Sequence, residues 1–512
     1  MRALLSVYDK TGLVQIATQL IELGCGLVST GGTAMALGNA GLPVQTVEEV
    51  TGFPEILDGR VKTLHPKIHG GLLALMNMPE HVATLEQLGI EPIDVLISNL
   101  YPFERAVSDS TLDMTARIEM IDIGGPAMIR SAAKNFASVV VVTDPADYGF
   151  VAATLADGQI DQTVRRRLAA KAFGHVSTYD SLVSAFLRES DQLFPEELTL
   201  PLRLAATPRY GENPHQAAAA YTRLGTEASR PGLLDAQQIA GEPLSFNNYL
   251  DANAAWQAVQ MFTEPAVAIV KHLVPCGLAV RANLAEAYEA ALDGDPVSAF
   301  GGIVALNRVV DVATAVTMRK IKLDVIIAPG YDSDARDILF KKKNTRVLIL
   351  PSGPESAERR SDFDVRPISG GLLLQVQDIQ VDHPANWDVV TKRPPTESQW
   401  RDLEFAWKTV RLVKSNAIVF ARDHAIVGLG AGQPNRLESV AIAARRAGDK
   451  AHGAVIASDA FFAFTDGVEL AIQAGVTSII QPGGSMRDLE VIDVANDSGI
   501  AMVFTNRRHF RH

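Results

Sequence analysis

Short apolar runs alternate with longer stretches of helical periodicity along the first 150 residues. A continuous apolar run is typical of a strand covered on both faces, whereas apolar residues that recur every three or four positions indicate an amphipathic helix. This pattern predicts strands at 3–7, 26–29, 43–47, 95–99 and 139–143, and helices at 13–23 and from the turn 30–33 through residue 40. Strands that alternate with helices predict a parallel α/β domain.

Three segments depart from this alternation. Glu48–Gly71 shows no regular periodicity and is rich in glycine, proline and charge, so we expect a functional loop there. Gln162–Arg188 carries a long helical pattern that should close the first domain. Asp191–Pro208 contains three prolines and is the predicted linker.

The α/β alternation resumes after the linker and occurs twice. The polar stretch Pro351–Asp362 separates the two series and predicts a surface loop. We therefore expect two domains, 1–198 and 199–512, the second with two subdomains that meet near 351–366. The expected strands are 267–271, 302–306, 325–327 and 347–350 in the first series, and 418–421, 426–430, 455–458, 478–481 and 501–505 in the second.

Composition narrows the class of protein. A chain of 512 residues is too long for one core, and 47% hydrophobic with 21% charged residues is ordinary globular composition. A net charge of -12 argues against nucleic-acid binding, although local cationic pockets can still bind small phosphates. Two cysteines cannot form a disulfide framework, and no apolar segment resembles a signal peptide or a membrane span. We expect a cytoplasmic enzyme.

Two glycine-containing segments of the first domain suggest anion binding. Glycines in the turn Thr30–Thr33 allow close approach of a ligand to a helix start, although a simple tight turn is an equal alternative. The loop Gly59–Gly71 carries three cations and two histidines, which favours a pocket for an anionic substrate over a solvated loop. Metal binding through His65 and His69 is conceivable, but no thiolate or carboxylate cluster accompanies them.

Further polar residues follow predicted strands. Tyr101 comes after the strand that ends at Asn99, and ligands of open α/β sheets bind at that carboxyl edge. Asp122 precedes a predicted helix, where it could be a simple N-cap. Lys134 lies about three turns further along the same helix, so the two can meet only through tertiary folding.

In the second domain, the apolar run Ile269–Val280 contains Lys271 and His272 and is predicted to turn at Pro275-Cys276-Gly277. Burying charged or polar groups without partners is unfavourable, so this pair either reaches solvent or has a function. An exposed strand end remains the simpler alternative.

Ordered motifs resemble the AICAR transformylase/IMP cyclohydrolase family. They include SVYDKTG, STGGTA, GRVKTLHPKIHGG, SNLYPF and DIGGPAMIRSAAKN in the first domain, and RYGENPHQ, KHLVPCG, SAFGG, KSN and SDAFF in the second. The resemblance covers essentially the whole chain. It implies an N-terminal methylglyoxal-synthase-like domain that cyclises FAICAR, the formylated aminoimidazole carboxamide ribotide. It also implies a transformylase region of two cytidine-deaminase-like subdomains.

The resemblance assigns residues to the cyclohydrolase site. Lys62, Tyr101, Asp122 and Lys134 would lie at the reacting end, and the substrate would be bound by Tyr8, Lys10, Thr30, Gly31, Gly32, Thr33, Arg60, Thr63 and Asn99. Tyr8 stands where the family usually has serine, and Met35 where lysine is common.

The same resemblance assigns the transformylase site. Lys271 would stabilise the transition state and His272 would be the general base. AICAR would contact Arg209, Tyr210, Phe300, Gly301, Asp324, Asn416, Arg436, Phe461 and Arg508, and the folate would contact Leu437, Asp466, Ser485 and Met486. Val274 departs from a usual polar residue, and Pro434-Asn435 from a usual serine before the arginine.

The implied cosubstrate is 10-formyltetrahydrofolate, and the implied assembly is a homodimer with transformylase sites at the subunit interface. A structural monovalent cation such as K⁺ is also implied, with no zinc, no nucleic acid and no membrane. A zinc deaminase would need a P-C-x-x-C element, but Pro275-Cys276 is followed by Gly277-Leu278. A non-catalytic nucleotide-sensing protein would not need Asp122, Lys134, Lys271 and His272 together. A Rossmann dehydrogenase lacks its G-x-G-x-x-G after the first strand.

Overall fold

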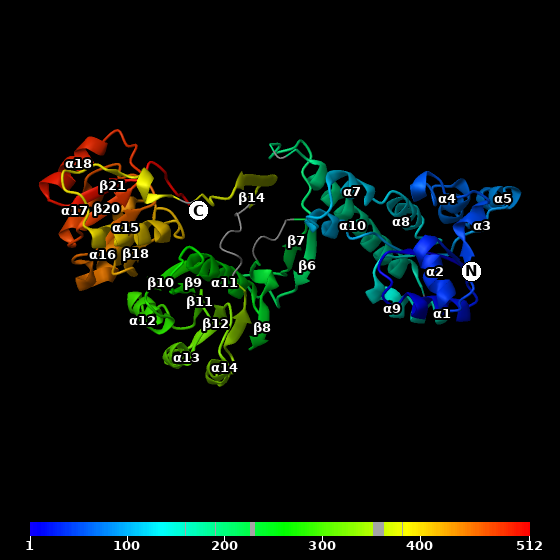
Figure 1. Cartoon of the computed structure of the whole chain (residues 1–512), viewed down its shortest axis with the longest axis horizontal. Helices are drawn as coiled ribbons and strands as arrows, with labels where there is room; N and C mark the ends of the chain where they lie inside the picture. Colours follow the sequence, from blue (N-terminus) through cyan, green and yellow to red (C-terminus); the bar gives the residue numbers. More distant parts are fainter. Residues whose placement is uncertain (159, 190, 226–230, 352–362, 381) are drawn as a thin grey trace. The chain divides into compact units, whose positions relative to one another are not determined.

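The computed structural model describes residues 1–158, 160–189, 191–225, 231–351, 363–380 and 382–512 (Figure 1). It divides into two compact units. Unit 1 comprises Met1–Arg203 with Tyr221–Glu227, and unit 2 comprises Leu204–Ala220 with Ala228–His512. No helix in the described ranges is long and apolar enough to cross a membrane.

Unit 1 is built on a five-stranded parallel sheet of order β3-β2-β1-β4-β5. The strands are β1 (Arg2–Val7), β2 (Gly26–Ser29), β3 (Gln45–Thr46), β4 (Val95–Asn99) and β5 (Val140–Val142). Successive residues of β1 enter different cores: Leu4 packs with one cluster, Ala3 and Leu5 with another. Burial on both faces explains why these strands read as continuous apolar runs.

Helices cover both faces of this sheet. The cluster that contains Leu4 draws on α8 and α10, and the cluster that contains Leu5 draws on α1 and α9. The helices are α1 (Leu13–Glu22), α2 (Gly31–Asn39), α3 (Val47–Thr51), α4 (Pro66–Leu73), α5 (Pro79–Gln87), α6 (Phe103–Ser108), α7 (Met114–Glu119), α8 (Gly124–Lys134), α9 (Tyr148–Ala156) and α10 (Gln162–Leu187), with short 3₁₀ turns η1 (Leu57–Gly59) and η2 (Pro145–Asp147).

The irregular loop predicted over Glu48–Gly71 is found at residues 52–65, where the 3₁₀ turn η1 is the regular element, but the prediction was wrong at both ends. Helix α3 begins there because Thr46 and Glu49 form a reciprocal capping box. Helix α4 begins at Pro66, whose fixed φ suits a first helical position, and His65 caps it by accepting the backbone N–H of Lys67. The turn expected at 30–33 is likewise the first turn of α2. Residues interpreted as loop-forming are therefore helix-starting residues.

Unit 2 contains one 12-stranded sheet of order β16-β21-β20-β19-β17-β18-β10-β9-β11-β12-β13-β8. Its strands are β8 (Gln237–Ala240), β9 (Ala266–Lys271), β10 (Val274–Val280), β11 (Gly302–Leu306), β12 (Leu323–Ala328), β13 (Arg346–Ile349), β16 (Asp388–Val389), β17 (Ile418–Arg422), β18 (Ala425–Gly430), β19 (Val455–Ser458), β20 (Ser478–Gln481) and β21 (Ala501–Phe504). The antiparallel pairing of β10 with β18 joins the two halves.

Each half has the same order of elements, as the second series of apolar runs predicted. A helix precedes an antiparallel strand pair, and three helices then alternate with three parallel strands. The helices are α11 (Phe246–Val259), α12 (Leu284–Gly294), α13 (Val312–Met318) and α14 (Ser333–Phe340) in the first half, and α15 (Glu397–Val410), α16 (Arg436–Ala447), α17 (Asp466–Gln473) and α18 (Asp488–Asp497) in the second, with 3₁₀ turns η3 (Leu233–Asp235), η4 (Pro384–Asn386) and η5 (Gly448–Ala451). Helices α11 and α15 lie over one face and share a single core.

The turn predicted at Pro275-Cys276-Gly277 lies elsewhere. These three residues belong to β10, and the chain reverses at His272-Leu273, directly after Lys271. The pairing of β9 with β10 shifts register between Pro275 and Gly277, so the proline occupies a bulge, where a missing N–H is tolerated. Cys276 is buried, and burial raises the pKa of its thiol to about 12.

Two small sheets complete the described structure. Strands β6 (Leu202–Ala206) and β7 (Ala220–Arg223) form one, and the hairpin β14 (Phe363–Ile368) with β15 (Gly371–Val376) forms the other. Strand β6 falls within the segment predicted as a linker. The surface loop predicted at Pro351–Asp362 lies, from residue 352 onward, outside the described residues.

Candidate active sites

Asn99 organises the loop that follows β1. Its Oδ1 accepts the backbone N–H groups of Tyr8 at 2.8 Å and Asp9 at 2.9 Å, and its Nδ2 donates to the Asp9 carbonyl at 3.1 Å. Tyr101, just past the end of β4, meets Tyr8 edge-on with ring centroids 4.6 Å apart. Tyr8, the departure from the usual serine, thus shares with Tyr101 a wall at the carboxyl edge of the sheet.

Lys62 lies beside the glycine turn at the start of α2. A Cβ on Gly31, which has a φ of +38°, would lie 3.4 Å from Lys62 Nζ, so the turn approaches the amine closely. Lys62 also forms an ion pair of 2.7 Å with Glu55. A Cβ on Gly124 would lie 2.5 Å from Thr63 Oγ1, which places the next residue of this loop against the start of α8.

Asp122 lies just before α8. Its Oδ1 accepts the N–H of Gly125 at 2.9 Å, and its own backbone N–H donates to the Tyr179 hydroxyl at 2.7 Å. Burial raises the pKa of its carboxyl, and hydrogen bonds from Gly125 and Gly124 oppose that shift only in part. A carboxyl with increased proton affinity at a sheet edge is suited to proton transfer.

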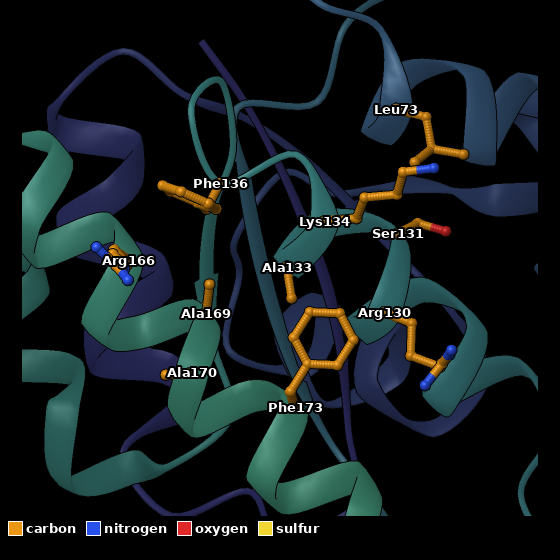
Figure 2. Close-up of a pocket in the computed structure, with 10 residues that line it drawn as sticks. All are labelled: Leu73, Arg130, Ser131, Ala133, Lys134, Phe136, Arg166, Ala169, Ala170 and Phe173. Carbon is orange, nitrogen blue, oxygen red and sulfur yellow. The ribbon is translucent and has the colours of Figure 1, made fainter.

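Lys134 is not brought to Asp122. It lies at the other end of α8, roughly 18 Å away along the helix at 1.5 Å per residue. There it lines a cavity of about 580 Å³ together with Arg130, Phe173 and Arg166 (Figure 2). Figure 2 shows Arg130 and Lys134 on α8 and Phe173 on α10 around this cavity.

The remaining cyclohydrolase candidates range from exposed to buried. Lys10 is exposed and donates to the Tyr8 carbonyl at 3.4 Å, and Arg60 is exposed and forms an ion pair with Glu119. Thr30 meets Ser6 through a hydroxyl contact of 3.0 Å. Thr33 is buried and exchanges hydrogen bonds with the backbone of Val7, at 3.1 and 3.0 Å.

In unit 2 the strand directions bring distant segments to one edge of the sheet, here called the site edge. Strands β9, β18, β19, β20 and β21 end at this edge, and β10, β11, β12 and β17 begin there. The transformylase candidates at or next to this edge are Lys271, His272, Phe300, Gly301, Asp324, Asn416, Arg436, Leu437, Phe461, Asp466, Ser485, Met486 and Arg508. Arg209 and Tyr210 precede β8 and lie outside the sheet.

Lys271 is held at the site edge by the segment before β11. Its Nζ donates to the Phe300 carbonyl at 2.6 Å. A Cβ on Gly301, which has a φ of +71°, would lie 3.7 Å from Lys271 Nζ and 3.9 Å from Asp324 Oδ1. His272, which follows directly, is exposed at the turn. The Phe300 side chain is also exposed, so the group faces solvent.

Arg436 is the centre of a second group at the site edge. It donates to Ser458 Oγ at 2.7 Å and Asp459 Oδ1 at 2.5 Å through Nη1, and to Asn416 Oδ1 at 2.7 Å through Nη2. Asn435, one of the departures from the family, caps α16 by accepting the N–H of Leu437 at 2.8 Å. The cap keeps Arg436 at the start of the helix, where it bonds to residues just before β17 and at the end of β19.

The C-terminal segment lies along this second group. The His509 N–H donates to the Asp459 carbonyl at 3.1 Å, and the Ser415 N–H donates to the Arg511 carbonyl at 2.8 Å. Arg508 stacks over Phe510 at 4.7 Å from the ring centroid. These bonds hold Arg508 beside the Arg436 group.

Sequence reasoning missed the group that fixes this segment. The buried His509 ring bonds to Asp378 through Nδ1 and to Asp382 through Nε2, the latter at 2.6 Å. Asp382 also accepts Trp407 Nε1 at 2.8 Å and Arg507 at 2.8 Å. The acidic pair Asp378 and Asp382 next to a basic C-terminus was the available signal, but nothing in the sequence indicated their contact.

The folate candidates lie at helix starts and in a loop at the site edge, with Leu437 in the first turn of α16. Asp466 begins α17 and accepts the N–H of Gly467 at 2.7 Å, and Ser485 accepts the N–H of Arg487 at 3.1 Å. Met486 is fully exposed, and Phe461 is exposed whereas Phe462 is in the core. Val274, the other departure, is half-buried against the core shared by α11 and α15.

Comparison with known proteins shows which family this chain resembles. Residues 132–446 match the model of the AICARFT/IMPCHase bienzyme family, and residues 12–127 match that of the MGS-like domain. The bifunctional purine biosynthesis protein PurH of Listeria monocytogenes serotype 4b (strain F2365) is 50% identical with all of both chains aligned. Its counterpart in Halalkalibacterium halodurans is 50% identical over all of this chain and 99% of its own. The crystal structure of ForH, 35% identical, covers 36% of this chain and 96% of its own with a TM-score of 0.34.

The fold and the family matches define the class of protein, a purine-biosynthesis bienzyme with an MGS-like domain. The chain belongs to the AICARFT/IMPCHase family. It is a bifunctional enzyme with AICAR transformylase and IMP cyclohydrolase activities, and the transformylase uses a folate cosubstrate. Full-length similarity to such enzymes does not favour the nucleotide-sensing alternative.

Proposed function

We propose that unit 2 transfers the formyl group of 10-formyltetrahydrofolate to AICAR at the site edge, and that unit 1 cyclises the product at the carboxyl edge of its own sheet. The observation that supports the first assignment best is the group of Lys271, Phe300, Gly301 and Asp324 beside exposed His272. Lys271 provides a cation and His272 an imidazole at a solvent-facing edge, where a substrate can enter.

In the transformylase, His272 removes the proton of the AICAR amine as that amine attacks. The amine is conjugated with the ring and its carboxamide, so it is a poor nucleophile without a base. The formyl carbon then becomes tetrahedral, and its oxyanion is stabilised by Lys271. When the oxyanion collapses, the bond between the formyl carbon and N10 of the folate breaks, and N10 takes the proton held by His272, so that tetrahydrofolate and FAICAR are released. Lys271 has three N–H donors, and within the described residues one is used on the Phe300 carbonyl, so the others remain for the oxyanion.

In the cyclohydrolase, the carboxamide nitrogen attacks a formyl carbon of the same molecule, and water then leaves. Because the reaction is intramolecular, the protein mainly has to hold one conformer and move protons. Asp122, with its increased proton affinity, and Lys62 are the proton-transfer groups, and Tyr101 and Asn99 shape the wall. Lys134 stays in the proposal as a residue needed for cyclisation, acting from the far end of α8 rather than beside Asp122.

We further propose that the protein forms a homodimer with the transformylase sites at the subunit interface. The hairpin β14–β15 supports this assembly, because a lone two-stranded hairpin is marginal in water and this one exposes apolar side chains. Ile368 is 50% exposed, Leu372 55% and Leu373 59%. Near the site edge, Met486 is fully exposed and Leu489 is 78% exposed. A second copy would cover such side chains.

A monovalent cation such as K⁺ and a cytoplasmic location complete the proposal. Asp459 is fully buried, and within the described ranges its Oδ2 has no hydrogen-bond partner. A buried carboxylate oxygen without a donor suits a hard cation. Such an ion would stabilise the Arg436 group, and the thermal midpoint of unit 2 should then be higher in K⁺ than in a tetraalkylammonium salt. Equal midpoints would contradict the cation.

The two-site assignment is tested by assaying each substrate separately with full-length protein. His272→Ala should lose formyl transfer and keep FAICAR cyclisation, and Lys134→Ala should do the reverse. Loss of both activities in either variant, with an unchanged circular dichroism spectrum, would show that the two reactions do not use separate sites.

A further inference from the structure

His272 occupies an unfavourable backbone conformation. It forms with Leu273 a two-residue reversal between β9 and β10, and both residues have positive φ, +54° and +64°. Two-residue hairpin turns of this kind favour Asn-Gly, because a Cβ crowds the backbone in the left-handed region. A histidine followed by a leucine therefore needs support from elsewhere in the structure.

That support comes from Asp251 on α11. One carboxylate oxygen, Oδ2, accepts the His272 N–H at 3.0 Å, and the other, Oδ1, accepts the Leu273 N–H at 2.7 Å. Both oxygens are used on consecutive amides, and bonds to a charged acceptor are stronger than neutral ones. Left-handed geometry points the two amides to the same side, so the carboxylate favours the conformation that the side chains resist.

The second half of unit 2 contains the same device. Asp423 and His424 form the reversal between β17 and β18 with φ of +51° and +52°. Asp402 on α15 accepts their N–H groups at 3.1 and 2.7 Å. In both halves the carboxylate precedes the first amide by 21 residues. The device is therefore part of the repeated fold.

The two copies lie at opposite edges of the sheet. Strand β10 runs antiparallel to β18, with Ala279 paired to Ala425, so the turn before β10 lies at the site edge and the turn before β18 at the other. The first copy carries Lys271 and His272, whereas none of the assigned site residues lies in the second. The His272-Leu273 turn therefore lies in the proposed site, and the Asp423-His424 turn has the same support outside the site and can act as its control.

We propose that Asp251 is a positioning residue for formyl transfer, which holds the His272-Leu273 turn in its left-handed conformation and so orients His272 toward the amine of AICAR. This inference rests on the role proposed above for His272. Asp251 acts through the backbone, because both of its carboxylate oxygens accept amides of the turn.

The test compares Asp251→Asn and Asp251→Ala with Asp402→Asn in the full-length protein. A displacement of about 1 Å in a reacting group can reduce a rate about 100-fold, so we expect kcat for formyl transfer to fall roughly 10- to 100-fold in the Asp251 variants. Their KM for AICAR should change little, because both Asp251 carboxylate oxygens are bonded to the turn and the proposed role of Asp251 is positioning. FAICAR cyclisation in unit 1 should be unchanged, and Asp402→Asn should keep formyl transfer.

A second substitution separates positioning from general stability. Glycine adopts positive φ without strain, so Leu273→Gly should restore much of the lost kcat in the Asp251→Ala background. The pH–rate profile should keep its shape in Asp251→Asn, because the base is displaced rather than changed. Thermal unfolding of unit 2 checks that each variant is folded.

Three results would overturn the inference. The first is full kcat in folded Asp251→Ala while His272→Ala is inactive, which would leave the role of His272 intact. The second is an equal loss of kcat in Asp402→Asn, which would indicate a general folding effect. The third is a shifted pH profile without rescue by Leu273→Gly, which would indicate direct action on charge. Active His272→Ala would instead overturn the proposed function itself, and this inference with it.

Discussion

At the scale of single residues, burial and hydrogen bonding shift the proton affinity of particular side chains. Asp122 is the clearest case, since burial raises the pKa of its carboxyl while backbone amides hold it at the start of α8. A group whose charged form is disfavoured in the folded state lowers stability once the pH exceeds its unfolded pKa of 3.8. The carboxyl is thus suited to chemistry and unfavourable for folding.

The raised pKa of Asp122 predicts that Asp122→Asn lowers activity and increases stability. FAICAR cyclisation should fall about 100- to 10,000-fold, the usual range for loss of a proton-transfer group, while formyl transfer stays unchanged. The thermal midpoint of unit 1 should rise at pH 7, because asparagine still accepts an amide N–H and carries no charge. The difference should vanish below pH 3.8, where the native carboxyl is protonated in both states. A lower midpoint at pH 7 would contradict this account.

His509 shows the opposite balance. Burial lowers the pKa of its imidazole, but the hydrogen bonds to Asp378 and Asp382 together raise this pKa by more than burial lowers it. The pKa of His509 is therefore raised overall. Burial of Asp382 acts against a low pKa, but its bonds to His509 and Trp407 prevail and lower it to about 2. The His509 contribution is full below pH 6.5 and lost as pH rises through the higher folded pKa. The Asp382 contribution is full above pH 3.8 and lost as pH falls toward 2.

His509→Gln should therefore be less stable than the native chain, most clearly between pH 3.8 and 6.5. We expect a difference of about 1–3 kcal/mol for loss of the charged imidazole from this group, reduced by the exposure of Asp378 and by the bonds that Asp382 keeps to Trp407 and Arg507. Denaturant midpoints across the pH range measure it, with Asp378→Asn as the milder matched variant. A difference that grows above pH 8 would show that the imidazole is not charged in the folded chain.

At the scale of elements, continuous apolar runs predicted the strands well. Runs at 95–99, 302–306, 455–458 and 478–481 coincide with β4, β11, β19 and β20, because burial on both faces imposes an unbroken apolar sequence. Short helices were missed where Thr46 and Pro66 start them, since a few residues cannot show periodicity. The turn at His272-Leu273 was missed because its support, Asp251, is distant in sequence.

Contacts between elements also could not be predicted from the sequence. The gathering of Lys271 and Arg436 at the site edge follows from strand directions across both halves, and the fixing of the C-terminal segment follows from Asp378 and Asp382. The separation of Lys134 from Asp122 follows directly from the length of α8, once the helix is known to be unbroken. The motifs predicted which residues belong to the two sites, but not the distances between these residues.

Gly277 gives a prediction at this scale. A Cβ there would lie 1.9 Å from the Ala291 carbonyl, so β10 and α12 are packed too closely for any side chain. Gly277→Ala should destabilise unit 2 by about 3 kcal/mol or more, because the opposing atom is helix backbone that cannot move aside. Gly149→Ala is the control, since nothing lies within 4 Å of its Cβ position. Differential scanning fluorimetry of both variants measures this, and equal midpoints would refute the close packing.

At the scale of the whole molecule, the homodimer proposal makes the β14–β15 hairpin a contact between copies. Leu372→Asp with Leu373→Asp should shift the sedimentation profile toward monomer, because a charge on a buried apolar contact opposes association. Formyl transfer should fall with dissociation, whereas FAICAR cyclisation should persist. Lys341→Asp, a charge change on a surface position elsewhere in unit 2, is the control. A profile unchanged by the leucine substitutions would remove the hairpin from the interface.

The shared sheet of unit 2 has a consequence for how the protein unfolds. Helices α11 and α15 contribute to one core that contains Val270 from the first half and Val419 from the second, and β10 pairs directly with β18. A boundary between independently unfolding segments requires a place where few contacts cross, and among the described residues this core instead joins buried side chains of both halves. The two halves should therefore melt in a single cooperative transition. A destabilising substitution near His272 would then increase the population of a state in which both halves are unfolded, and the Arg436 group would be lost with it. The folded structure between the two residues would not have to change.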